Sequence, residues 1–159
     1  MDREKDALEK LYRERYRTFR DVLAGIVGSH DLAREVVQEA FARALRERHK
    51  WRGEGTLEAW VWRIAINVAL KTRKELRRRW ELEEAPPPEP LAESDHDVRA
   101  VVRSLPPRRR LLVFLRYFAD LTYAEIAQAT NVAEGTVAAT LAQAHAELRE
   151  LVEREGVKR

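Results

Sequence analysis

The sequence contains no cysteine, which excludes a disulfide framework and a thiolate metal site. Its four histidines are scattered and show no spacing of metal ligands. No apolar run approaches the ~20 residues that a membrane-spanning helix needs. The N-terminus is charged from its second residue, unlike a signal peptide. We therefore expect a cytoplasmic protein with no membrane segment, no bound metal and no cofactor.

The signals of an enzyme are also missing. We find no pairing of a nucleophile with a base, and the two glycines of RGEGT, residues 52–56, lack the pattern of a phosphate-binding loop. Alanine, leucine, glutamate and arginine dominate, and all four are good helix formers. No segment alternates with period two for long, so the sequence predicts an all-α fold.

Charge is distributed unevenly along the 159 residues. Residues 1–80 hold 20 basic and 13 acidic residues, whereas residues 81–97 hold seven acids and no base. Three consecutive prolines in ELEEAPPPEPLAESDHD cannot continue a helix, and this stretch has little to bury. The sequence therefore predicts two small helical domains, residues 1–80 and 97–159, joined by an acidic proline-rich linker over 81–96.

Apolar side chains at three- and four-residue steps predict the helices of both domains. Thr56 can cap the third helix, and Thr122 with Glu125 forms a capping box. A short helix, a tight turn at Asn131 and a longer helix then form a helix-turn-helix in the second domain. The predicted helices cover residues 5–26, 31–50 and 57–80 in the first domain, and residues 97–104, 107–118, 122–130 and 134–153 in the second.

The predicted helix 57–80 places aromatic rings beside a basic face. Single-stranded nucleic acid is bound by cations along its backbone and by flat rings against its bases. We assign Trp60 to the core because it lies on the apolar stripe, and Trp62, off that stripe, to either the core or a nucleic-acid contact. The predicted helix 31–50 exposes acids beside an apolar stripe, which on composition alone is an ordinary solvated helix rather than a protein-docking surface.

Three sequence stretches together resemble a known family. DLAREVVQEAFARAL and WRGEGTLEAWVWRIAINVAL are similar to the second conserved region of sigma-70 factors, and more narrowly to the extracytoplasmic-function (ECF) group. LPPRRRLLVFLRYFADLTYAEIAQATNVAEGTV resembles the fourth region. The resemblance covers about residues 8–152, with the two regions in the family's order and the acidic linker between them.

The resemblance implies a promoter-specificity subunit that directs promoter recognition and DNA melting in bacterial transcription initiation and is not itself an enzyme. Its implied partners are the RNA polymerase core, promoter DNA and, where one exists, an anti-sigma factor. The implied core-polymerase contacts are Asp31, Glu35, Gln38, Glu39 and Phe41. The implied contacts to the −10 element are Arg52, Trp62, Arg63, Asn67, Lys71, Arg73 and Lys74. The implied contacts to the −35 element are Arg116, Tyr123, Thr136, Ala139, Thr140 and Gln143.

The helix-turn-helix departs from the family pattern in its charge. From Tyr117 to Leu148 there are four acids and no lysine or arginine, although phosphate neutralisation supplies most non-specific DNA affinity. A weakened −35 contact remains open, through Gln143 to adenine and through amide groups at the start of the last helix, with charge from Arg116 and residues 108–110. The alternative is a sigma-derived protein-interaction module that binds polymerase or a regulator without reading a −35 element. A free-standing DNA-binding regulator and a hairpin that merely packs are further alternatives.

Overall fold

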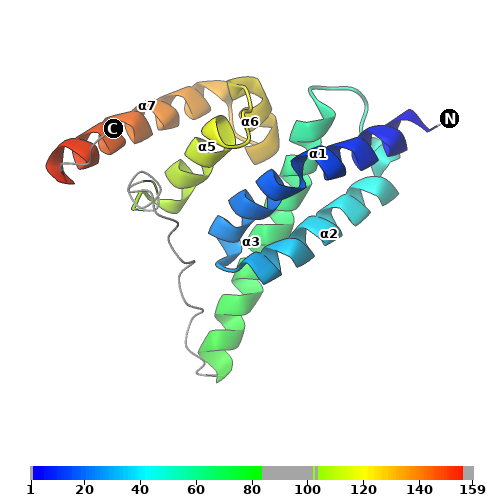
Figure 1. The fold of residues 1–159 in the computed structure, drawn as a ribbon, viewed down its shortest axis with the longest axis horizontal. Coiled ribbons are helices and arrows are strands. Elements are labelled where there is room, and N and C mark those ends of the chain that lie inside the picture. Colours follow the sequence, from blue (N-terminus) through cyan, green and yellow to red (C-terminus); the bar gives the residue numbers. More distant parts are fainter. Residues whose placement is uncertain (1, 84–101, 103, 156–159) are drawn as a thin grey trace.

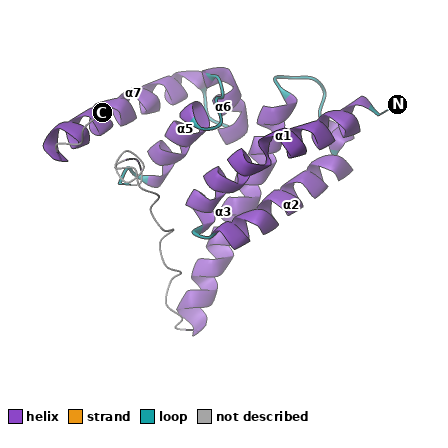
Figure 2. Cartoon of the chain, in the orientation of Figure 1, coloured by secondary structure: helices purple, strands orange, loops and turns teal. Residues whose placement is uncertain are grey.

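The structure, a computed structural model, describes residues 2–83, 102 and 104–155 (Figure 1). This part of the chain is built from helices and contains no strand (Figure 2), which confirms the predicted all-α class. Most of the predicted linker and of the predicted helix 97–104 lies outside the described residues. The helices are α1 (Arg3–Val27), α2 (His30–Arg46), the short 3-10 helix η1 (Arg48–Lys50), α3 (Leu57–Glu83), α5 (Pro107–Tyr117), α6 (Tyr123–Thr130) and α7 (Glu134–Glu155).

Helices α1 and α2 begin at residues whose side chains cap the first turn, and α1 ends at a glycine. The Asp2 side chain accepts from the Lys5 amide at the start of α1, and the Ser29 hydroxyl accepts from the Leu32 amide at the start of α2. Between the two helices, Gly28 has a φ of 85°, the left-handed conformation that favours glycine at a helix end. Gly28 and Ser29 therefore form the turn between α1 and α2.

Helix α3 continues to Glu83, three residues beyond its predicted end at Trp80. The prediction placed the boundary where the charge changes sign. A run of acids does not terminate a helix, however, since glutamate and leucine have high helix propensity. The domain boundary near residue 80 remains a prediction.

Helices α5, α6 and α7 form the predicted helix-turn-helix domain. The capping box is present: the Thr122 hydroxyl accepts from the Glu125 amide at 3.1 Å, and the Glu125 carboxylate accepts from the Thr122 amide at 3.0 Å. Asn131 ends α6 in the left-handed conformation, with φ 55° and ψ 41°. Short local signals were sufficient to predict this motif.

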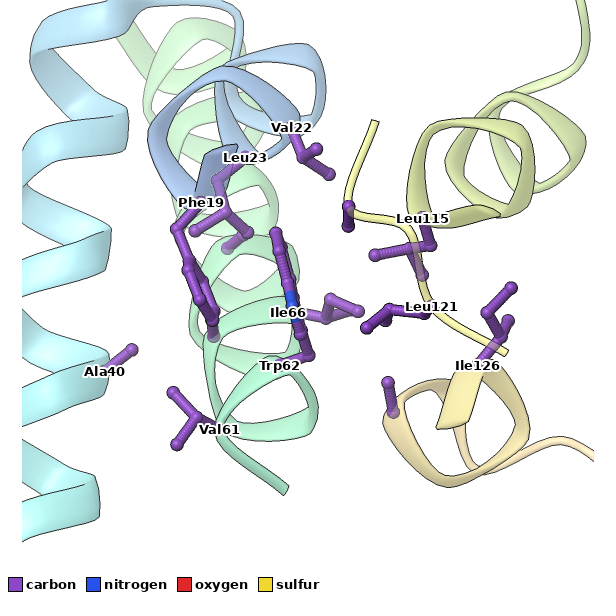
Figure 3. Close-up of a cluster of buried hydrophobic side chains, with 14 of the residues drawn as sticks. Phe19, Val22, Leu23, Ala40, Val61, Trp62, Ile66, Leu115, Leu121 and Ile126 are labelled. Atoms are coloured by element: carbon purple, nitrogen blue, oxygen red, sulfur yellow. The ribbon is translucent and has the colours of Figure 1, made fainter. Parts of the chain in front are cut away.

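One continuous hydrophobic core joins the two halves of the chain. Helix α3 packs against α1 and α2 on one side and against α6 on another, and α1 also contacts α5. Figure 3 shows Trp62 and Ile66 of α3 facing Leu121 and Ile126 from the helix-turn-helix domain. Two chain segments that the sequence predicts as separate units are therefore packed together in this structure.

Candidate nucleic-acid and polymerase interface

The loop between η1 and α3 carries the first group of candidate residues. Gly53 and Gly55 adopt φ values of 78° and 69°, which residues with a side chain rarely adopt. The Thr56 hydroxyl then accepts from the Ala59 amide at 3.1 Å and caps α3, as predicted. This cap fixes the end of the loop to a rigid helix.

A cavity of about 400 Å³ lies at this loop. Two half-buried indoles, Trp51 and Trp60, line it together with the exposed cations Arg52 and Arg63. Flat rings and cations around one cavity are the features that bind an unstacked base and its phosphate. Trp60 packs against the hydrophobic core, as predicted, and its half-buried ring also lines this cavity.

The structure contradicts the assignment of Trp62 to the −10 surface. Trp62 is fully buried, and its ring stacks on Phe19 with centroids 3.8 Å apart and planes 11° apart. The prediction assumed a single apolar stripe on this helix, with Trp60 on the stripe and Trp62 off it. The packing of α6 buries a second, adjacent stripe that contains Trp62 and Ile66, so no nucleotide can reach Trp62 in this conformation.

The remaining −10 candidates on α3 form a ridge along one face. Arg63, Asn67, Lys71 and Lys74 are all exposed, and their spacing of four, four and three residues keeps them on that face. Arg73 is half-buried beside this ridge. Burial lowers the pKa of the Arg73 guanidinium, and the nearby charge of Arg77 lowers it further, but an arginine remains protonated at neutral pH.

A larger groove of about 510 Å³ runs beside this ridge, between α3 and the helix-turn-helix domain. Arg63 and Arg73 line it from α3, and Arg108 and Arg110 line it from α5. The structure therefore brings basic residues from both halves of the chain to one groove whose walls are otherwise largely apolar.

Helix α2 presents the candidate polymerase contacts. Asp31, Glu35, Gln38 and Glu39 are exposed, with Asp31 paired to Arg34 and Glu39 within 3.4 Å of Arg43. Phe41 is only 8% exposed, and its ring meets Tyr12 and Phe19 edge-on. Phe41 lies on the apolar face of α2, where it holds α2 against α1 and also lines a groove of about 380 Å³ with Leu8 and Tyr12. A direct polymerase contact for Phe41 stays a prediction.

The long helix α7 exposes most of the candidate −35 residues. Thr136, Ala139 and Gln143 are exposed and Thr140 is half-buried, while the opposite stripe is buried. That stripe contains Val137, Leu141 and Ala144, and Leu148 and Leu151 are half-buried further along the helix.

Two of the candidate cations near α7, Arg116 and Arg109, make contacts within the domain. Arg116 donates to the Leu121 carbonyl at 3.0 Å and lies 5.6 Å from the Tyr123 ring centroid, and both side chains are half-buried. Arg109 forms an ion pair with Glu147. On α7 itself, His145 shares a 2.6 Å hydrogen bond with the Tyr117 hydroxyl. The centre of the exposed face of α7, around Ala139 and Gln143, carries no charged residue.

If α7 faces the DNA groove, adding a cation to its exposed face should restore a phosphate contact. We expect Ala139→Arg to increase the affinity of the polymerase complex for upstream duplex about eightfold at 0.1 M salt, and to steepen its salt dependence by about 0.9. Fluorescence anisotropy at several salt concentrations measures both quantities. Ala7→Arg, at an exposed position of α1, is the matched control. An equal gain from both variants would contradict this orientation of α7.

Sequence reasoning missed Gln128, a half-buried residue of α6. Its side chain reaches the loop before α3 and makes three hydrogen bonds with it. No local pattern marks such a residue, because its partners lie more than 70 positions away in the sequence.

Neither a membrane-spanning helix nor a metal-binding cluster occurs among the residues that the structure describes. No helix in this part of the chain is long and apolar enough to cross a membrane. Within the same residues, no three histidine, aspartate or glutamate side chains gather in a group that could hold a metal ion.

Comparison with known families matches both halves of the chain. The model for Sigma-70 region 2 matches residues 11–81, and the model for Sigma-70, region 4 matches residues 95–148. The RNA polymerase sigma-E factor of Streptomyces coelicolor is 34% identical over 128 residues, which cover 74% of this chain and 70% of the relative. The chain therefore belongs to the sigma-70 family of RNA polymerase sigma factors, within its ECF group.

Two further relatives are also sigma factors, and this chain covers different shares of their lengths. The ECF RNA polymerase sigma factor SigE of Mycolicibacterium smegmatis is 32% identical over 155 residues, which cover 89% of this chain but only 57% of the relative. The RNA polymerase sigma factor YlaC of Bacillus subtilis is 26% identical over 160 residues, which cover 91% of each chain.

Solved structures share the fold. The sigma factor RpoE of Bartonella quintana, in complex with the anti-sigma factor NepR, has a TM-score of 0.69 at 21% identity, with 94% of this chain and 98% of that chain covered. CnrH, in complex with the cytosolic domain of CnrY, has a TM-score of 0.68 at 18% identity, with 94% and 90% covered. This chain thus shares its fold with both solved structures.

Proposed function

We propose that this chain directs promoter recognition through three surfaces, binding the polymerase core with α2, the melted −10 strand with the α3 ridge and loop, and upstream duplex with α7. The observation that carries the proposal is the ridge of exposed cations on α3, which leads to a cavity lined by Trp51 and Trp60. Cations that track a backbone and rings that stack bases are what single-strand binding needs.

The same arrangement supports a role without catalysis. The chain supplies specificity and strand capture, and the polymerase supplies the chemistry. We infer that it acts in the cytoplasm, where polymerase and promoter DNA are found. We also infer that an anti-sigma factor is a candidate regulator, because the structural relative RpoE is in complex with the anti-sigma factor NepR.

Transcription from a library of promoter fragments tests the proposal. Core polymerase with the chain should produce run-off transcripts from a subset of fragments that core alone does not transcribe. Sequencing the transcribed fragments then identifies the promoter. Core polymerase that retains the chain but transcribes no fragment would instead favour a protein-interaction module, the alternative that the uncharged face of α7 supports.

The acidic face of α2 makes a separate prediction about the polymerase contact. We expect Glu35→Lys combined with Glu39→Lys to weaken capture of core polymerase at least about tenfold, because like charges brought together in an interface are strongly unfavourable. Glu14→Lys with Glu153→Lys changes the net charge equally at exposed positions outside α2. Quantitative pull-down with core enzyme measures the retention of both double variants. Equal retention of the two would show that α2 is not the docking surface for polymerase.

A further inference from the structure

The groove beside the α3 ridge combines positive charge with apolar walls. Its four arginines come from two helices, Arg63 and Arg73 from α3 and Arg108 and Arg110 from α5. None of the described residues that line the groove is acidic. Within the described part of the chain, no carboxylate forms an ion pair with Arg63, Arg73 or Arg108. Among these residues, the charges of three guanidinium groups at one groove are therefore not balanced by an ion pair.

The environment of Arg73 itself favours a bound anion. Arg73 is half-buried, and burial lowers the pKa of its guanidinium because a charged group loses hydration there. The nearby charge of Arg77 lowers that pKa further. An anion bound beside Arg73 would oppose both effects, since an opposite charge stabilises the protonated guanidinium.

Apolar side chains form most of the remaining lining. Leu70 of α3 is 46% exposed, and the side chains of Leu111, Phe114 and Val132 are half-buried along the groove. On the α1 side, a Cβ atom at Gly25 would come within 4 Å only of the Phe114 ring, at 3.9 Å. The missing side chain at Gly25 therefore leaves room beside that ring for an apolar or aromatic group.

The size and the polar groups of the groove define a class of ligand. Its volume of about 510 Å³ lies in the range of pockets that bind small molecules. Guanidinium groups bind phosphate oxygens through two parallel hydrogen bonds. Asn67 and Asn131, both exposed, also line the groove, and each side-chain amide offers donors and an acceptor to the edge of a base.

Other small anions match fewer of these features. A long-chain carboxylate carries one negative charge and would leave most of the guanidinium groups unpaired. Inorganic phosphate and sugar phosphates have no apolar body to place against Leu70 and Phe114. A nucleoside polyphosphate has both a flat ring system with polar edges and several negative charges, so it matches the walls and the arginines together.

We propose that this groove is a binding site for a nucleoside polyphosphate, with Arg73 and Arg108 holding its phosphates and with Leu70 and Phe114 against its base. The site is composite, because α3 and α5 each supply a guanidinium group and neither helix forms the groove alone. The proposal does not depend on the roles proposed for α2, the α3 ridge and α7.

Binding of mant-ATP, an ATP with a fluorescent group on its ribose, tests the proposal on the full chain. We expect saturable binding by fluorescence anisotropy at about 0.1 M salt, with displacement by unlabelled ATP or GTP. Tripolyphosphate lacks the base and adenosine lacks the charge, so each should compete at least about tenfold more weakly than ATP. Competition by either one as strong as that of ATP would overturn the proposal. So would the absence of mant-ATP binding together with no heat on titration of unlabelled ATP.

Single variants test whether both halves of the chain form the site. Arg73→Ala and Arg108→Ala should each lower the affinity for mant-ATP at least about tenfold, because each removes charge-assisted hydrogen bonds to phosphate. Arg17→Ala and Arg149→Ala remove the same charge at exposed positions outside the groove, and we expect almost no change. Equal losses in all four variants would show that binding follows net charge, and the site would be wrong.

Gly25→Leu tests the apolar wall without changing the charge. Its side chain should occupy the space beside Phe114 and clearly lower the affinity for mant-ATP, while the melting temperature shows that the chain remains folded. Ala7→Leu, at an exposed position of the same helix, is the matched control. Unchanged affinity in Gly25→Leu would show that the base does not lie in this groove.

The loop cavity lined by Trp51 and Trp60 is a second place where a nucleotide could bind. Combining Arg52→Ala with Trp60→Ala removes a cation and a ring from that cavity, and neither residue lines the groove. We expect this double variant to bind mant-ATP as the parent does. A loss of binding here, with none in Arg73→Ala or Arg108→Ala, would place the nucleotide in the loop cavity and overturn the assignment of the groove.

Discussion

Replacing Trp62 with alanine is expected to lower the free energy of unfolding by about 3–5 kcal/mol, the range for removing a large aromatic side chain from a core. Trp62 is fully buried. Its ring stacks on Phe19 of α1 on one side and faces the helix-turn-helix domain on the other. For a chain of this length the melting temperature should fall by roughly 10 °C. Thermal unfolding followed by far-ultraviolet circular dichroism measures the change.

Trp60→Ala is the matched control, since it makes the same chemical change two residues away. Trp60 is half-buried and lines the loop cavity, so its removal should cost clearly less stability. It should instead weaken promoter opening by the polymerase complex, because base stacking on one ring is worth about 1–3 kcal/mol. Comparable loss of stability in the two variants would contradict their assignment to different roles.

Removing three cations from the α3 ridge is expected to give the largest loss of promoter-strand binding. If Arg63, Lys71 and Lys74 each meet one phosphate, their replacement by alanine should reduce the slope of log affinity against log salt by about 2. At 0.1 M salt this corresponds to about a 100-fold loss. Binding of single-stranded −10 oligonucleotides to the polymerase complex, titrated at several salt concentrations, measures both values.

A control for this triple variant must lose the same net charge elsewhere. Lys5, Lys10 and Arg17 are exposed on α1 and suit this purpose. Their replacement by alanine should leave the salt slope nearly unchanged. A similar loss in both triple variants would show that binding follows net charge rather than the ridge, and the −10 assignment of α3 would then be wrong.

Contacts within a few residues of one another were predictable from the sequence. The Thr122–Glu125 capping box, the left-handed Asn131 and the Thr56 cap each depend on side chains and amides three or fewer positions apart. The acidic face of α2 and the cationic ridge of α3 follow in the same way from helical periodicity. The resemblance to sigma factors extended these local patterns to a family, which the comparisons confirm.

Burial on a helix that has several neighbours was not predictable. A periodic pattern reveals one apolar stripe, but α3 is covered from two directions, so Trp62 is buried and Trp60 lies nearer the surface. Phe41 was assigned to a surface through family resemblance, although its place beside Tyr12 and Phe19 depends on how α1 crosses α2.

The amino-acid sequence by itself determined the helical class, the helix-turn-helix and the charged faces, because helix propensity, capping and periodicity are local properties of the chain. Only the tertiary structure decided which aromatic rings are buried and that Gln128 meets the loop before α3. These depend on packing between segments far apart in the sequence, where shape and hydrogen-bond complementarity act across space and leave no periodic trace in the order of residues.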